Sequence, residues 1–263
     1  MIKIENVVTP SGDQWNSIIM GMRNPMNSWA KSDSLFFDDS EGHLCTIGQG
    51  RGELSLIELG PNDHKLLMNL RNAGPSDRKV MRMIPVYLDI TAPLYWWKEF
   101  DTYKVGTVAN SCSTMHKIHA KEFALEDFST EHLLPPAIFT IKDTIKWLNY
   151  FRDCYSQHDS LKDGTIPASH EVQEILERIS KKDLWWQMIQ LLPSSYNQKR
   201  TILLNYEVLL NMYHSRKNHK LDEWRELCKW IETLPYSEII TGREVGDLAS
   251  KSAGKETKEN KND

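Results

Sequence analysis

Residues 191–216 read LLPSSYNQKRTILLNYEVLLNMYHSR, and this stretch decides the fold class. From residue 196 to residue 215 the apolar side chains recur at the spacing of one helix face, which predicts a long helix. Three more segments share that spacing, at residues 143–155, 171–192 and 221–234. The C-terminal half is therefore expected to be helical.

The N-terminal half mixes predicted strands and helices. Strands are expected at residues 2–8 and 80–90, and helices around Trp15 to Met22, from Pro61 to Gly74 and from Pro93 to Phe100. Residues 24–60 are rich in Ser, Asp and Gly, so we expect a long loop with at most a small hairpin near residues 54–59. Residues 133–140 also predict a loop, because Pro135-Pro136 cannot lie in a helix interior.

These segments together predict an α+β fold, a small and mostly antiparallel sheet packed with several long helices. The 263 residues suit one enlarged domain over residues 1–240. Residues 241–263 have few apolar side chains and many charges, which predicts a disordered charged tail.

Composition excludes several classes of protein. The net charge of -4 gives no overall basic field, so we expect no nucleic-acid partner. No window approaches the roughly 20 apolar residues of a membrane span, and MIKIENVV lacks the pattern of a signal peptide. The four cysteines form no CxxC pair, so neither a zinc knuckle nor a dithiol redox site is expected. The expected location is the cytoplasm.

Common catalytic signatures are also missing from the sequence. It has no GxSxG, Walker loop, HExxH or GxGxxG motif. His116 and His119 are three residues apart, but surface or core histidine is the simpler interpretation, and no metal site is predicted. The missing signatures exclude several large classes of enzyme.

Two segments carry more specific motifs, residues 191–216 and residues 92–116, which read APLYWWKEFDTYKVGTVANSCSTMH. Together they resemble the flavin-dependent thymidylate synthases, in which an Ala-Pro step begins a helix with a Gln and leads to an Arg-His-Arg motif. Ala92-Pro93 lies in the matching place, Glu99 stands at the Gln, and Thr102-Tyr103-Lys104 occupies the Arg-His-Arg site. The family's Asn and Ser are matched by Asn110 and Ser113.

The C-terminal segment matches the family without a gap. The family has Leu-Pro, a polar turn, and a long helix with two Asn residues and an Arg beyond them. The corresponding residues are Leu192-Pro193, Asn205, Asn211 and Arg216. Upstream, residues 23–28 echo an Ala-Arg-x-Ser element, which implies that Ser28 lies near the flavin phosphates.

The resemblance implies a homotetramer that methylates dUMP, with methylenetetrahydrofolate as carbon donor, FAD as cofactor and NADPH as reductant. It assigns FAD contacts to Ser28, Tyr103, Lys104, Asn110, Asn205 and Asn211, and pyrimidine nucleotide contacts to Glu99, Ser113 and Arg216. No residue is assigned as the catalyst, because the cofactor carries the chemistry. The residue types suit these roles, since amides suit the polar edges of a flavin and Arg can bind two phosphate oxygens.

The sequence departs from the family at arginine positions. Thr102, Met115 and Ile189 stand where the family has Arg, and Glu207 also replaces one. The resemblance implies that the arginines lost at Met115 and Ile189 bind phosphate. Charge-assisted hydrogen bonds contribute roughly 1.5 to 3 kcal/mol each, so losing these two weakens nucleotide binding by on the order of a hundredfold or more. Two alternatives therefore stay open: an inactive nucleotide-binding or interaction protein on the same fold, and a structural oligomer without a ligand.

Overall fold

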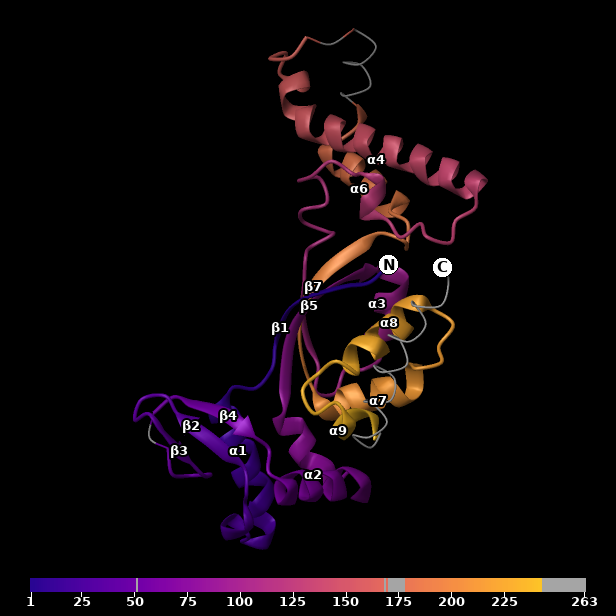
Figure 1. Ribbon diagram of the computed structural model, residues 1–263. Coiled ribbons are helices and arrows are strands. Elements are labelled where there is room, and N and C mark those ends of the chain that lie inside the picture. The colour runs from indigo at the N-terminus through magenta and orange to yellow at the C-terminus, as the bar shows by residue number, and fades with distance from the viewer. Residues whose placement is uncertain (51, 168, 170–177, 243–263) are drawn as a thin grey trace, which may run out of the picture. The chain divides into compact units, whose positions relative to one another are not determined.

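The computed structural model describes residues 1–50, 52–167, 169 and 178–242 (Figure 1). These residues divide into two compact units. The first unit contains residues 1–4, 90–102 and 110–201, and the second contains residues 5–89, 103–109 and the described residues from 202 onward. The single domain expected over residues 1–240 stays a prediction, and the predicted tail lies outside the described residues from 243 onward.

The larger sheet has four strands in the order β1-β5-β7-β6. Their bounds are Lys3–Val8 for β1, Pro85–Pro93 for β5, Asn197–Asn205 for β7 and Val108–Ser111 for β6. The boundary between the two units falls inside each of these strands. The mixed helix and sheet architecture confirms the predicted α+β class.

Helix α1 (Gly12–Arg23) begins the second unit as the sequence predicts. The Ser11 hydroxyl accepts from the backbone N–H of Gln14, and the Gln14 side chain accepts from the Ser11 N–H, so two amides at the helix start are satisfied. Trp15, Ile18 and Met22 are buried on one face. The apolar positions chosen from helical spacing are thus core positions.

The loop predicted over residues 24–60 is wrong. This stretch contains two short 3-10 helices, η1 (Asn24–Met26) and η2 (Trp29–Lys31), and an antiparallel sheet in the order β3-β2-β4. The strands are β2 (Leu35–Asp38), β3 (His43–Cys45) and β4 (Leu54–Glu58). The buried Asp38 carboxylate accepts from the amides of Ser40, Glu41 and Gly52. Polar side chains thus stabilise the turns of this sheet, so the spacing of apolar residues in the sequence does not indicate its strands.

The middle of the chain follows the prediction with shifted boundaries. Helix α2 (Pro61–Ala73) is present. Residues Arg78–Met83 form a 3-10 helix, η3, and not the beginning of a strand. The strand predicted over residues 80–90 is β5, and it begins only at Pro85. Proline is tolerated there because it is the first residue of the strand. Helix α3 (Leu94–Phe100) follows, with Pro93 as its N-cap.

The first unit contains the long helix α4 (Pro135–Lys162) and helix α6 (Lys181–Leu191), which pack side by side (Figure 1). The loop predicted at residues 133–140 is wrong, since Pro135 and Pro136 lie in the first turn, where no intrahelical donor is needed. Of the helix predicted over residues 171–192, residues 171–177 lie outside the described residues. Leu148 of α4 and Met188 of α6 form a buried apolar cluster with Ile118, Phe123 and Phe128. The short 3-10 helix η4 (Leu125–Asp127) lies between Phe123 and Phe128 in the sequence.

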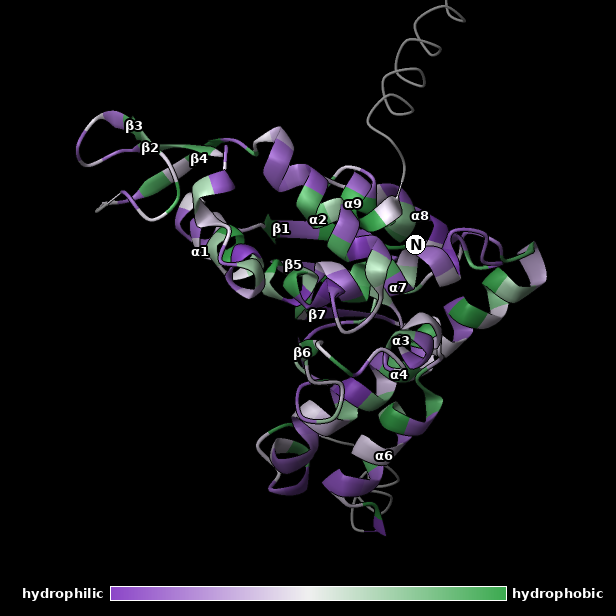
Figure 2. Cartoon of the chain, turned by 90° about the horizontal axis from the view of Figure 1, so that it is seen from below, coloured by the Kyte–Doolittle hydropathy of each residue, from purple (hydrophilic) through white to green (hydrophobic). Residues whose placement is uncertain are grey.

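The long helix predicted at residues 196–215 is also wrong. Strand β7 comes first, and helix α7 (Tyr206–Arg216) starts only after Asn205. Helices α8 (Asp222–Ile231) and α9 (Glu238–Thr241) follow. Figure 2 shows hydrophobic and hydrophilic residues mixed along the helices. Within the described residues, no helix combines the length and the apolar character that a membrane crossing requires.

Candidate functional site

A surface cleft of about 750 Å³ lies in the second unit, where the end of α1 and the two 3-10 turns meet α2. Its lining combines cations, a hydroxyl and amides with two apolar side chains: Arg23, Met26, Ser28, Lys31, Asn62, Lys65, Leu66 and Asn69. Ser28, which we expected near phosphates, lies in this wall. The other residues of the wall place cationic and amide side chains beside Ser28.

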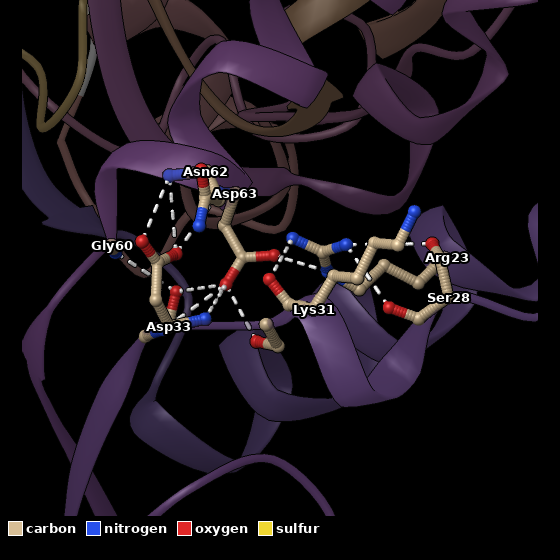
Figure 3. Close-up of polar contacts among 9 residues, drawn as sticks. Arg23, Ser28, Lys31, Asp33, Gly60, Asn62 and Asp63 are labelled. Atoms are coloured by element: carbon tan, nitrogen blue, oxygen red, sulfur yellow. Dashed lines mark hydrogen bonds and ion pairs between the residues drawn. The ribbon is translucent and has the colours of Figure 1, made fainter.

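Arg23 builds the frame of the cleft (Figure 3). Its Nε donates to Asp63 Oδ1 at 2.5 Å, its Nη1 donates to the Ser28 carbonyl oxygen at 3.1 Å, and its Nη2 donates to the Lys31 carbonyl oxygen at 3.0 Å. Arg23 is only 3% exposed and Asp63 is fully buried. One guanidinium therefore fixes the backbone at the two ends of η2, and with it the positions of Ser28 and Lys31.

Asp63 is held as an anion by a set of donors. Its Oδ2 accepts from the hydroxyls of Ser32 at 2.6 Å and Ser34 at 2.7 Å, and from the Ser34 amide at 3.1 Å. Burial alone raises the pKa of this carboxyl, but the hydrogen bonds from Ser32, Ser34 and Arg23 outweigh burial and lower its pKa below the usual value. The buried ion pair is thus fully hydrogen-bonded.

The start of α2 is already occupied by a carboxylate. Asp33 accepts from the backbone amide of Asn62 at 2.9 Å and from that of Asp63 at 3.2 Å. A helix start often binds an anion through such amides, and here Asp33 takes that place. An anionic ligand in the cleft must therefore be held by side chains, chiefly the exposed amines of Lys31 and Lys65 and the Ser28 hydroxyl.

Arg216 and Tyr103, both predicted in the site, contact one another. Arg216 Nε donates to the Tyr103 hydroxyl at 3.0 Å, and its guanidinium carbon lies 4.7 Å from the ring centre of the buried Trp224. Tyr103 and Trp224 also pack with ring centres 5.8 Å apart. The two aromatic rings set the direction of the Arg216 guanidinium.

Asn205 does not lie inside a helix, as the predicted helix over residues 196–215 implied, because it caps the start of α7. Its side-chain oxygen accepts from the Val208 amide at 3.0 Å and so starts α7. Asn211 is exposed on α7, and Lys104 is exposed in the loop after α3. Glu207, at a family Arg position, forms an ion pair with Arg82 at 2.6 Å. The charge at Glu207 is thus offset within this unit.

Gly106 packs against the Asn205 cap, and replacing Gly106 by alanine is expected to destabilise the protein by about 2 to 3 kcal/mol. Gly106 has φ +78, and a Cβ there would come 2.9 Å from Asn205 Nδ2. Left-handed backbone costs an ordinary residue about 1 to 2 kcal/mol, and the collision adds to that cost. Urea denaturation of the variant measures the loss. Gly42→Ala is the matched control, since Gly42 has φ +70 and open space around it. Equal losses in the two variants would exclude the Asn205 collision.

The remaining predicted residues belong to the first unit. Glu99 is half-buried on α3 and Asn110 is exposed on β6. The Ser113 hydroxyl accepts from the His116 amide at 2.9 Å and so shapes a turn. At the two lost arginine positions after Ser113, the Met115 carbonyl oxygen accepts from Trp185 Nε1 at 2.7 Å, while Ile189 packs on the apolar core cluster.

Sequence reasoning missed several polar residues of the cleft wall and frame: Lys31, Asn62, Asp63, Lys65 and Asn69. Asp63 was placed only at a helix start, and nothing in the spacing of residues 23 and 63 indicates their ion pair. Within the described residues, no group of three His, Cys, Asp or Glu side chains could hold a metal ion.

No family model matches the sequence, and no curated protein matches it. Solved structures do match. A thymidylate synthase X from Helicobacter pylori with FAD and dUMP has a TM-score of 0.55 at 13% identity, over 92% of this chain and 98% of that chain. A second structure, a flavin-dependent thymidylate synthase from the same organism complexed with FAD and dUMP, has a TM-score of 0.54 at 14% identity over the same shares.

A UMP/dUMP methylase from Streptomyces cacaoi bound with 5-Br dUMP has a TM-score of 0.48 at 11% identity, over 92% of this chain and 95% of that chain. The first two matches span nearly the whole of both chains. This chain therefore has the fold of the flavin-dependent thymidylate synthases.

Proposed function

We propose that this chain is a divergent flavin-dependent thymidylate synthase, which methylates dUMP reductively to dTMP with methylenetetrahydrofolate as carbon donor. The observation that carries the proposal is the cleft around Ser28, where two amines, a hydroxyl and two side-chain amides line one wall of a chain with this fold. NADPH as reductant and assembly as a homotetramer belong to the same proposal.

The donors of the cleft fit the pyrophosphate of FAD. Lys31 and Lys65 offer amines for its charge, and Ser28, Asn62 and Asn69 offer uncharged donors beside them. Arg23 is not available as a phosphate ligand through its Nε, because that atom is bound to Asp63. When bound, FAD supplies the hydride chemistry of the reaction. The residues of the cleft position the cofactor through its phosphates.

Arg216 is the proposed anchor for the pyrimidine nucleotide. Its guanidinium is held by the Tyr103 hydroxyl and the Trp224 ring, so little rotamer freedom is left to lose on binding. Glu99 and Ser113 complete the proposed set of nucleotide contacts. Tyr103, Lys104, Asn110, Asn205 and Asn211 stay proposed contacts of FAD.

The test is flavin binding by the double variant Lys31→Gln, Lys65→Gln. Each charge-assisted hydrogen bond lost is expected to weaken FAD binding by about tenfold, so the double variant loses about a hundredfold. The dissociation constant is measured by quenching of flavin fluorescence, with dUMP added to detect a shift of the flavin absorbance band. Lys220→Gln, Lys229→Gln is the control, with two exposed lysines outside the cleft. A wild-type protein that binds no FAD at micromolar concentration would end the proposal.

An inactive nucleotide-binding protein on this fold is the second candidate. The observation that favours it is Ile189, which is packed on the core cluster at a position where the family has Arg. This candidate predicts that flavin or dUMP binds while NADPH oxidation and dTMP formation stay at background. Complementation of a thymidine-requiring strain by the wild-type chain decides for the enzyme.

A further inference from the structure

A second pocket, of about 360 Å³, lies in the first unit beside the packed helices α4 and α6. Its wall is made of cationic, titratable and aromatic side chains with one methionine: Met115, His116, Tyr155, Lys181, Lys182 and Trp185. No acidic side chain is among these lining residues. The pocket shares no lining residue with the Ser28 cleft and does not include Arg216, Tyr103 or Trp224.

Side-chain contacts hold the wall of this pocket in place. Trp185 Nε1 donates to the Met115 carbonyl oxygen at 2.7 Å, which fixes the turn before His116 to α6. Lys181 Nζ lies 2.7 Å from Asp159 Oδ2 and 5.1 Å from the ring centre of Tyr155. The His119 ring packs on Tyr155 with ring centres 4.5 Å apart. The Tyr155 ring of the wall is thus already contacted by Lys181 and by His119.

The local field in this region favours an anion. Burial lowers the pKa of His119, and the charges of Lys117 and Lys181 lower it further, which indicates a cationic neighbourhood around this imidazole. Its Nδ1 is buried and has no hydrogen-bond partner among the described residues. Two carboxylates offset part of this positive charge, since Asp159 pairs with Lys181 and contacts His158, and Asp183, which accepts from the Ser180 amide and hydroxyl, interacts with Lys182.

We infer that this pocket binds a phosphoryl group, with the Lys182 and Lys181 amines and the His116 ring as its donors. Amines act as point charges for phosphate oxygens, and a compact tetrahedral anion needs no aromatic face. The phosphate can belong to a nucleotide such as dUMP or to another small phosphorylated compound. The inference stands on the pocket alone and does not depend on flavin binding in the second unit.

The test is calorimetric titration of the full chain with inorganic pyrophosphate, inorganic phosphate, dUMP and deoxyuridine. We expect pyrophosphate to bind and Lys182→Gln to weaken that binding by about tenfold. Lys146→Gln is the matched control, since Lys146 is an exposed lysine on α4 outside the pocket. It removes the same charge and is expected to change the affinity less than twofold. Thermal melts of both variants check that each is folded.

Labelling of lysines in the wild-type chain gives a second measurement that needs no variant. Pyrophosphate is expected to protect Lys181 and Lys182 from acetylation, as read by peptide mass spectrometry, and to leave Lys146 reactive. Binding of dUMP without binding of deoxyuridine, lost in Lys182→Gln, supports the pocket as a second site for a nucleotide phosphate, apart from Arg216. Binding of pyrophosphate alone supports a different phosphorylated ligand. No heat at millimolar pyrophosphate, or equal losses in Lys182→Gln and Lys146→Gln, overturns the inference.

Discussion

Replacing Asp63 by alanine is expected to lower the free energy of unfolding by about 3 to 5 kcal/mol, because it leaves the buried Arg23 guanidinium without its counter-ion. The substitution also strands the hydroxyls of Ser32 and Ser34, which donate to the same carboxylate. Urea denaturation followed by far-ultraviolet circular dichroism measures the loss. A change of this size is a large fraction of the stability of a typical domain, so the proportion of folded chain is measured at 10 °C as well.

The matched control is Asp39→Ala in the same unit. Asp39 is exposed, and its carboxylate accepts from the Ser55 hydroxyl at 2.8 Å. A surface contact of this kind contributes at most about 1 kcal/mol. Similar losses in Asp63→Ala and Asp39→Ala would contradict the argument from burial. The Ser28 cleft should deform only in the first variant, since Arg23 holds the Ser28 and Lys31 carbonyl oxygens.

The same carboxylate gives stability a defined dependence on pH. Asp63 has a folded-state pKa below its ordinary value of 3.8, so the stabilisation is fully present above that value. As the pH falls, the Asp63 carboxylate of the unfolded chain is protonated first. The stabilisation is lost once the pH falls through the folded-state pKa and the native carboxylate is protonated too. Unfolding free energies of the wild type and Asp63→Asn are expected to converge as the pH falls from 5 towards 2. A constant difference over that range would exclude Asp63 as the titrating group.

Replacing Trp224 by alanine is the second large effect, with an expected loss of about 3 to 5 kcal/mol in the free energy of unfolding. Trp224 is fully buried and lies against both Tyr103 and Arg216. The variant therefore opens a cavity and removes the ring that orients the Arg216 guanidinium. Urea denaturation gives the stability, and titration with dUMP gives the nucleotide affinity.

Two comparisons make this prediction specific. Trp147→Ala removes a ring that is 52% exposed and is expected to cost less than about 1 kcal/mol. Trp224→Phe keeps an aromatic face for Arg216, so it should lose stability but retain more of the nucleotide affinity than Trp224→Ala does. If the two Trp224 variants bind dUMP equally well, the ring has no role in placing Arg216.

The sequence predicted the fold class because apolar spacing marks α1, α2 and α8 directly, but it misassigned β7. Ile202 and Leu204 are buried on β7, Leu203 between them is half-buried, and Thr201 before them is exposed, which is a strand pattern. The pattern is hidden because another buried position is Gln198, whose Nε2 donates to the Cys112 carbonyl oxygen. A buried polar side chain that is hydrogen-bonded inside the protein cannot be told from a surface residue by the sequence pattern alone.

The candidate site was predicted in part for a similar reason. The motifs placed Tyr103 and Arg216 in the site, but their hydrogen bond joins residues 113 positions apart, which no local spacing reveals. The Arg23 and Asp63 pair is separated by 40 positions and was likewise not predicted. Resemblance to a family finds residues at motif positions. It does not find the partners that hold them, because those are chosen by the fold.

The unit boundaries inside β1, β5, β6 and β7 restrict how this protein can be dissected. Neither unit is one continuous stretch of chain, so no single truncation yields either of them whole. Residues 110–201 are the longest stretch of the first unit, and both ends of that stretch lie within strands. An excised fragment would carry two severed strand halves with unpaired backbone groups, which favour edge-to-edge aggregation. Circular permutants opened in a surface loop keep all four strands intact and are the better route to rearranged versions of this chain.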